Sequence, residues 1–166
     1  MTPAPEGLTV VPEPSFSTRE IALAGLADAS QAIRRAIDAD DEASILTRTA
    51  EALGHLYALW SAYGVNGKQQ VAWAASDVER RNVVAMVYVR GEVAHRGVHA
   101  AMAVGFGEGP YGVGPFGGGW LWRECPARPG YEASAVLYEE QALWCWVYEP
   151  LERALAWFAT HEPPAR

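Results

Sequence analysis

Arg90 and His95 are the residues of this chain whose types and spacing most directly suggest chemistry. An imidazole can take the proton of a ribose 2′-hydroxyl, while a guanidinium holds the scissile phosphate and stabilises the charge of the transition state. If both lie on one helix, they are about 140° apart around its axis, and the long arginine side chain still reaches toward the imidazole. The pair therefore predicts metal-independent cleavage of RNA, leaving a 2′,3′-cyclic phosphate.

The same two residue types also recur earlier, where Arg48 and His55 have six residues between them. We favour Arg90 and His95 because their predicted helix also contains Gly91 and Gly97. Each glycine costs about 1 kcal/mol of helix propensity relative to alanine. Close approach of another backbone would explain them, so this helix is the expected interface of any homodimer.

Capping boxes indicate where the first and third helices begin. Ser17 and Glu20 fit a capping box that opens a helix over residues 17–37, and a second helix over residues 41–63 stops near Gly64. These two helices should pack antiparallel. A further capping box over residues 76–79 opens the helix that carries Arg90, which we expect to continue to residue 104.

The C-terminal half combines short strands with short helices. Tryptophans alternate in residues 120–122, and aromatic residues alternate in residues 144–148, which predicts two strands paired as a ribbon. We expect a short helix over residues 131–141 and a last one opened by Pro150. The fold class is therefore mainly α, an antiparallel helical bundle with a small two-stranded β ribbon near the C-terminal half.

Two segments stand apart from this bundle. Residues 1–16 contain four prolines and are expected to form an extended Pro-rich arm, followed by a single helical domain over residues 17–166. Residues 105–119 repeat a Gly-Pro-aromatic pattern, which excludes a helix and predicts a loop. This loop lacks the Lys-Ser/Thr ending of a phosphate-binding P-loop, so we expect no nucleotide cofactor there.

Composition limits the classes of partner. The chain has 166 residues, enough for one hydrophobic core, and a formal net charge of −7. This charge provides no general attraction to nucleic acid, so any RNA contact must be local. Cys125 and Cys145, without a signal peptide, predict reduced thiols and a cytoplasmic location, and no run approaches the roughly 18 apolar residues of a membrane span.

The segment from Arg90 to His95 resembles the Arg-x4-6-His signature of the HEPN superfamily, helical bundles that include metal-independent RNases of toxin–antitoxin and antiphage systems. The resemblance implies that Arg90 and His95 are catalytic, that two copies meet in a homodimer, and that an antitoxin or another protein is a partner. Active members usually place Asn, Asp or His directly after the arginine, where this chain has Gly91. A degenerate relative is therefore an alternative. Residues 87–99 and the elements after them also resemble small actinobacterial or phage-borne proteins.

A metal site is a second alternative that uses some of the same residues. Glu92, His95 and His99 are spaced by three and four positions and so share one helix face. His55, on the preceding helix, could complete the set, because two histidines and a carboxylate can bind a divalent metal. Such a protein would resemble helical-bundle metalloproteins of the DinB fold.

The third hypothesis needs no catalytic residue. In it, the chain is a phage- or defence-associated interaction protein that oligomerises through the helix containing Gly91 and Gly97. The Pro-rich arm and the Gly-Pro-aromatic loop would be its binding segments. RNA cleavage that depends on His95 separates this class from the ribonuclease class.

Overall fold

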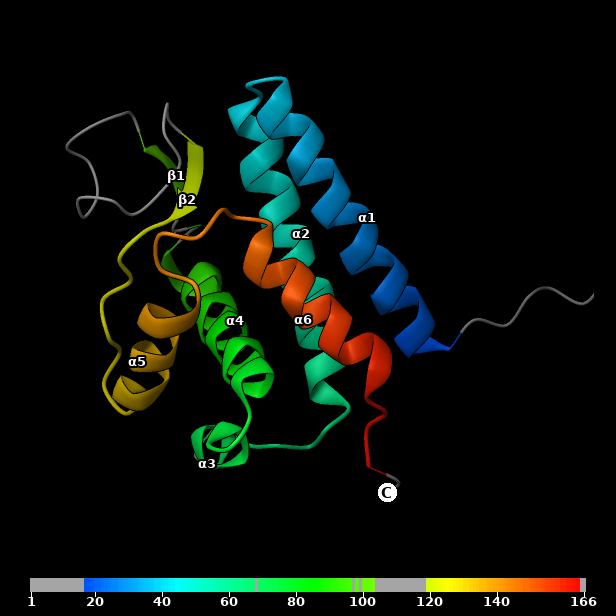
Figure 1. The fold of residues 1–166 in the computed structure, drawn as a ribbon, viewed down its shortest axis with the longest axis vertical. Helices are drawn as coiled ribbons and strands as arrows, with labels where there is room; N and C mark the ends of the chain where they lie inside the picture. Colours follow the sequence, from blue (N-terminus) through cyan, green and yellow to red (C-terminus); the bar gives the residue numbers. More distant parts are fainter. Residues whose placement is uncertain (1–16, 68, 97, 99, 104–118, 165–166) are drawn as a thin grey trace, which may run out of the picture.

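Helices form most of the described chain, which confirms the prediction of a mainly α protein (Figure 1). The computed structural model describes residues 17–67, 69–96, 98, 100–103 and 119–164. The predicted arm over residues 1–16 and nearly all of the predicted loop over residues 105–119 lie outside these ranges. The elements are α1 (Thr18–Asp38), α2 (Glu42–Ser61), α3 (Gln70–Ala74), α4 (Val78–Arg96), β1 (Ala100–Ala103), β2 (Gly119–Trp122), α5 (Glu132–Gln141) and α6 (Glu149–Thr160).

Helices α1 and α2 form an antiparallel hairpin along one side of the molecule (Figure 1). The predicted capping box opens α1, because the Ser17 hydroxyl accepts from the Glu20 amide at 3.2 Å and the Glu20 carboxylate accepts from the Ser17 amide at 2.7 Å. Asp41 caps α2 by accepting from the Ser44 amide at 3.1 Å. These helix starts follow from local residue chemistry and match the predicted ones.

Helix α4 is the centre of the bundle. All side chains of residues 82–89 are buried, and α4 contacts α2, α3, α5 and α6. A helix that is covered on every side needs apolar residues around its whole circumference, which explains the valine-rich sequence. The one polar residue of this run, Asn82, donates from its side-chain amide to the Pro150 carbonyl at 2.9 Å and so joins α4 to the start of α6.

Both predicted ends of the α4 region need correction. Asp77, rather than Ser76, caps the helix, because its carboxylate accepts from the amides of Glu79 and Arg80 at 2.9 and 3.1 Å. The helix ends at Arg96, and Ala100–Ala103 then pair antiparallel with β2 instead of extending the helix to residue 104. Alanine and methionine favour helices, so the available hydrogen-bonding edge of β2 decides this conformation.

Residues 120–122 were predicted to pair with residues 144–148 as a ribbon, but the structure gives them a different partner strand. β2 pairs with β1, and the second segment follows β2 only irregularly. The Trp144 amide donates to the Trp122 carbonyl at 3.0 Å, and the Trp122 amide donates to the Cys145 carbonyl at 3.1 Å. Residues 144–148 therefore lie beside β2 but do not form a strand, because the backbone turns sharply at Trp144, where φ is 64°.

The predicted short helix and last helix are confirmed as α5 and α6, with Pro150 in the first turn of α6. Trp157 and Phe158 of α6 are buried in a cluster of aromatic rings with Tyr63 of the α2–α3 connection and Trp73 of α3. Helix α3 was not predicted, and this cluster explains its position. Among the described residues, none of the helices has both the length and the apolar character needed to cross a bilayer.

Candidate functional site

The C-terminal part of α4 carries both predicted catalytic residues. The Arg90 guanidinium lies over the ring of Tyr57 on α2, with its central carbon 4.0 Å from the ring centroid. This cation–π contact holds the plane of a half-buried guanidinium against the neighbouring helix. Arg90 has no carboxylate partner among the described residues. Six other arginines form ion pairs with carboxylates, namely Arg19, Arg34, Arg48, Arg80, Arg81 and Arg128.

His95 lies in the last two turns of α4, five residues after Arg90. The helical backbone therefore separates the two positions by about 140° around the axis, as expected from the sequence. The side chain of His95 and the whole of His99 lie outside the described part of the chain. The proximity of the imidazole to the Arg90 guanidinium thus remains a prediction.

Glu92, between these two residues, is almost completely buried, with 1 % of its surface exposed. Its carboxylate lies 3.7 Å from Nε of Arg128, and the Arg128 guanidinium in turn lies 4.0 Å from the ring centroid of Tyr131. Arg128 belongs to residues 123–131, which cross α4 between β2 and α5 and which we call the strap. The buried carboxylate thus links α4 to the strap through an ion pair and is not an open ligand position.

Two tyrosines from neighbouring helices also fasten the strap. The Tyr88 hydroxyl of α4 donates to the Pro126 carbonyl at 3.1 Å, and the Tyr138 hydroxyl of α5 donates to the Arg123 carbonyl. Burial raises the pKa of Tyr88 to about 12, and burial also raises the pKa of Tyr138. Both hydroxyls are therefore protonated at neutral pH and act as hydrogen-bond donors that hold the strap.

Gly91 faces the strap in the described part of the chain. A Cβ atom at this position would lie 3.9 Å from the nearest Arg128 nitrogen, which is an ordinary contact distance. Packing within the chain therefore does not require a glycine here. Since residues 82–89 are enclosed by neighbouring helices, a second copy could approach α4 only beyond them. Gly97 lies outside the described residues, so the dimer through this helix remains a prediction.

The second Arg-x6-His match has a structural role. Arg48 pairs with Glu51 at 2.7 Å, and the His55 imidazole packs so closely on Gly25 of α1 that an added Cβ would lie 2.3 Å from it. His55 thus faces α1, whereas Tyr57, two positions later on α2, faces α4. This geometry keeps His55 away from Glu92.

The alternative metal site is therefore not assembled by the residues that can be followed. Glu92 faces the strap, His55 faces α1, and the side chains of His95 and His99 are not described. Within the described ranges, no three His, Cys, Asp or Glu residues form a group that could hold a metal ion.

Sequence reasoning missed two features near this end of α4. Arg128 pairs with Glu92 across 36 positions of sequence, and no local pattern indicates that contact. Trp144 has a φ of 64°, a conformation that costs a bulky residue about 1–3 kcal/mol and that glycine normally adopts. The alternation of aromatic residues predicted a strand at Trp144. A bulky residue gives no sequence signal for a turn with positive φ, so the turn was not predicted.

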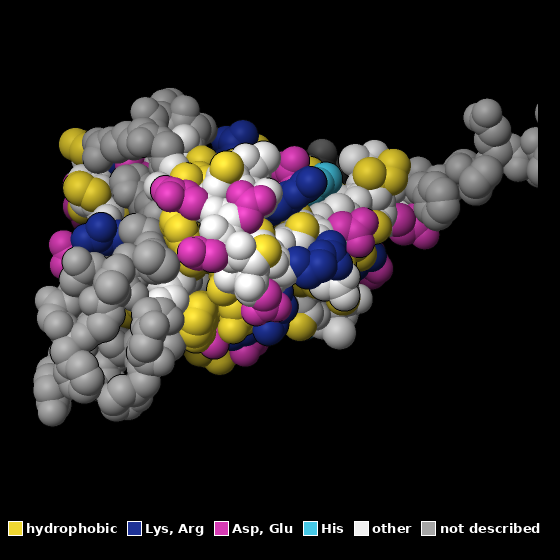
Figure 2. Space-filling model, turned by 90° about the horizontal axis from the view of Figure 1, so that it is seen from above, with side chains coloured by type: hydrophobic (Ala, Val, Ile, Leu, Met, Phe, Trp, Pro, Cys, Tyr) yellow, Lys and Arg dark blue, Asp and Glu magenta, His cyan; other side chains and the backbone are white. Residues whose placement is uncertain are grey.

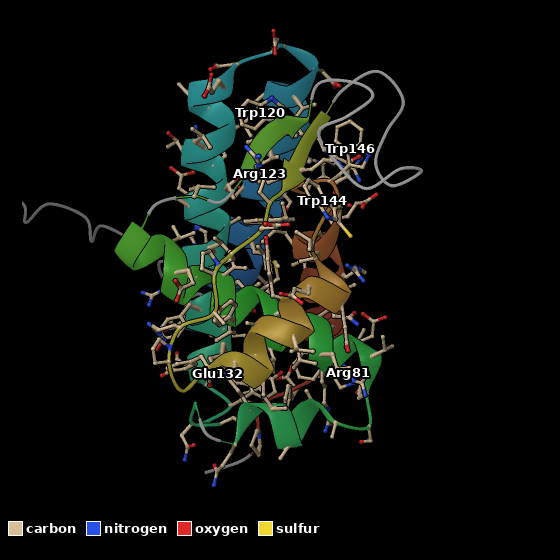
Figure 3. All side chains as sticks on the ribbon, turned by 90° about the vertical axis from the view of Figure 1, so that its left-hand side faces the viewer. Arg81, Trp120, Arg123, Glu132, Trp144 and Trp146 are labelled. Carbon is tan, nitrogen blue, oxygen red and sulfur yellow. The ribbon has the colours of Figure 1, made fainter. Side chains whose placement is uncertain are left out.

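The described surface carries no broad basic patch on the face that Figure 2 shows, where basic and acidic side chains are interspersed. Figure 3 shows Arg123, Trp144 and Trp146 around β2 and the segment that follows α5. Comparison of the chain with known protein families, with curated proteins and with solved structures finds no match.

Proposed function

We propose that this protein is a metal-independent endoribonuclease whose active site is the C-terminal part of α4. In this proposal His95 is the general acid and base, and Arg90 binds the scissile phosphate. A dimer in which two such helix ends face each other would provide a pair of these residues at one cleft, as the resemblance to the HEPN superfamily implies.

The main support for the proposal is the environment of the Arg90 guanidinium. Arg90 is partly buried, its guanidinium is held against Tyr57, and no carboxylate among the described residues neutralises it. By contrast, Arg128 on the other side of α4 is ion-paired with Glu92. A positioned guanidinium that forms no ion pair with the described residues is suited to two oxygens of a phosphate.

The reaction is an internal transfer at phosphorus. The His95 imidazole takes the proton of the 2′-hydroxyl, the 2′-oxygen forms a bond to phosphorus, and the bond from phosphorus to the 5′-oxygen breaks. The imidazolium then gives its proton to the departing 5′-oxygen. The products are a 2′,3′-cyclic phosphate and a 5′-hydroxyl end, with no water or redox partner consumed. Arg90 stabilises the extra negative charge on the phosphoryl oxygens in the transition state.

The test compares purified full-length protein with its His95→Ala and Arg90→Ala variants on a single-stranded RNA, with and without a chelator. General acid–base catalysis contributes about 10²- to 10⁴-fold, so His95→Ala should lower the rate by at least about 100-fold. Analysis of the product ends should find the cyclic phosphate, and the chelator should leave the rate unchanged.

Arg48 and His55 provide matched controls, because they repeat the residue types and have structural roles. Arg48→Ala should leave the rate unchanged, and His55→Ala should do so in preparations whose circular dichroism confirms folding. Cleavage that survives both His95→Ala and Arg90→Ala would overturn the proposal. So would a wild-type protein that leaves the RNA intact.

A further inference from the structure

Trp144 occupies a backbone position that is suited to glycine. The two described glycines with positive φ, Gly64 at 66° and Gly130 at 85°, lie in connections where such a turn is expected. Trp144 has a φ of 64° because the chain turns there from the end of α5 onto β2, and its amide donates to the Trp122 carbonyl at 3.0 Å. A tryptophan in this conformation is strained, so its side chain has to be explained by something other than the turn.

Core packing explains Trp144 less completely than it explains four other tryptophans of the chain. Four other tryptophans are buried, with 0–6 % of their surface exposed, namely Trp60, Trp120, Trp122 and Trp157. Trp144 is only partly buried, and it makes no contact with another aromatic ring among the described residues. Strain is retained at sites where it serves function more often than elsewhere.

A second half-buried tryptophan lies in the same segment. Trp146 stacks on Tyr148, with ring centroids 5.9 Å apart and planes 21° from parallel. The Arg34 guanidinium lies 3.8 Å from the Tyr148 ring centroid, so Tyr148 contacts both the Trp146 ring and a cation from α1. These contacts give Trp146 a fixed orientation beside Leu121 of β2, with which it forms a backbone bridge.

The charges around these rings are mixed. Arg123 directly follows β2, is exposed, and has no side-chain hydrogen bond or ion pair among the described residues. The nearby acidic groups are Glu124, which is exposed, and Glu149, whose carboxylate accepts from the Trp146 amide at 3.3 Å. Arg123 is therefore the cation of this surface that can bind a phosphate (Figure 3).

This surface lies next to the C-terminal end of α4. The chain leaves α4 at Arg96 and enters β1 at Ala100, which pairs directly with Trp122 of β2. Trp144 is hydrogen-bonded to Trp122, and Arg123 follows Trp122 in sequence. Trp144, Arg123 and the proposed catalytic end of α4 are thus connected through one pair of strands.

We propose that Trp144, Trp146 and Arg123 bind single-stranded RNA, with unpaired bases stacked on the indoles and a phosphate on the guanidinium. This inference rests on the proposed ribonuclease function and names its substrate class. Aromatic stacking accepts any base whose face is free, which a duplex does not offer. The net charge of −7 also disfavours binding through a long phosphate backbone, so stacking has to supply much of the affinity.

The sharpest test is Trp144→Gly in full-length protein that also carries His95→Ala, so that RNA is bound without being cleaved. Base stacking on an aromatic residue is worth about 5- to 150-fold in affinity, and fluorescence anisotropy with a labelled single-stranded oligonucleotide should detect that loss. Glycine relieves the strained backbone but also removes a largely buried indole, so circular dichroism has to confirm that the variant is folded before its affinity is compared with that of wild type. A tryptophan with a purely structural role would give a lower melting temperature with unchanged affinity, and would overturn the inference.

Two further variants refine this test. Trp73→Phe alters a half-buried tryptophan of the aromatic cluster around Trp157 and should leave RNA affinity unchanged. Arg123→Ala should weaken binding and reduce the slope of log affinity against log salt by about 1. Binding of a duplex as tightly as a single strand, or no binding of RNA at all, would overturn the inference.

The two proposals can fail separately. If cleavage survives His95→Ala while Trp144→Gly still weakens the binding of single strands, the catalytic proposal is wrong and the binding surface stands. If cleavage depends on His95 while Trp144→Gly binds single strands normally, the catalytic proposal stands and the surface is wrong.

Discussion

The α1–α2 hairpin and the strap over α4 are held in opposite ways. The hairpin depends on close packing, and its tightest point is the His55 imidazole on Gly25. The strap, residues 123–131, is held by separate polar contacts, namely the hydroxyls of Tyr88 and Tyr138 on its carbonyls and the pair of Glu92 with Arg128. The hairpin is thus fixed mainly by packing, whereas the strap combines these polar contacts with the burial of Cys125 in the core.

This difference indicates where function is to be sought. Close packing tolerates few changes and leaves little surface for a ligand. The strap side of the molecule contains the buried Glu92 carboxylate and the strained Trp144 beside β2. It also contains Arg123, which has no carboxylate partner among the described residues. Proteins retain such unfavourable features more often at functional sites than in scaffolding.

The largest effect is expected from Arg128→Met. It removes the cation beside the buried Glu92 carboxylate, and loss of one partner of a buried ion pair costs about 3–5 kcal/mol. Because 30 % of the Arg128 side chain is exposed, we expect the free energy of unfolding to fall by about 2–4 kcal/mol in a urea titration. Arg48→Met, which breaks the exposed pair with Glu51, should cost less than about 1 kcal/mol. Equal losses in the two variants would contradict a special role for the strap contact.

Gly25→Ala should break the hairpin at its tightest point. The added Cβ would lie 2.3 Å from the His55 imidazole, so ring and helix have to shift, and such overpacking costs about 1–3 kcal/mol. Thermal unfolding should show the loss, and the double variant Gly25→Ala/His55→Ala should recover most of it. Gly54→Ala is the matched control, since nothing lies within 4 Å of its added Cβ, and it should gain up to about 1 kcal/mol from helix propensity. A Gly25→Ala protein as stable as wild type would show that the contact is not tight.

Tyr88→Phe tests the strap through pH. Loss of the hydrogen bond to Pro126 should lower the free energy of unfolding by about 1 kcal/mol at pH 8. Burial raises the pKa of Tyr88 to about 12, whereas an unfolded tyrosine has a pKa of about 10. The stability linked to this proton is therefore complete below about pH 10 and is lost as the pH rises toward about 12, because the unfolded chain releases the proton first. Unfolding titrations from pH 8 to 11.5 should show a shallower alkaline decline for Tyr88→Phe than for wild type, and parallel declines would contradict this.

The smallest effect is expected from Gly91→Ala. The added Cβ has room beside Arg128. The higher helix propensity of alanine should therefore raise the free energy of unfolding of the protein by up to about 1 kcal/mol. If a second copy packs on this position, the same methyl group should weaken self-association in sedimentation velocity. A variant that is more stable and self-associates as wild type does would exclude Gly91 from any dimer interface.

Local sequence signals predicted the helices well. The capping box of Ser17 and Glu20 and the proline at the start of α6 each act within one helical turn, and α1, α2 and α6 begin where expected. The cap of α4 was predicted one residue early, since Ser76 and Asp77 are both good capping residues. Which of two adjacent caps is used depends on how the helix is oriented by its neighbours.

Sequence patterns were less predictive where the conformation of a segment depends on pairing with another segment. Ala100–Ala103 were expected in a helix, and they form β1 because β2 offers them hydrogen bonds. Residues 144–148 were expected to form a strand, and the turn at Trp144 prevents it. Alternation of aromatic residues normally marks a strand with one exposed face, yet all four residues of β2 are buried.

The sequence by itself determined that this is a mainly helical protein and that Arg90 and His95 share one helix, because both conclusions follow from periodicity and capping along the chain. Only the tertiary structure decided which side chains meet. It placed Arg90 on Tyr57, buried Glu92 under Arg128, turned His55 toward α1, and brought Trp144 and Arg123 beside the end of α4. These contacts join segments far apart in the chain, and they follow from how the helices pack rather than from any local pattern.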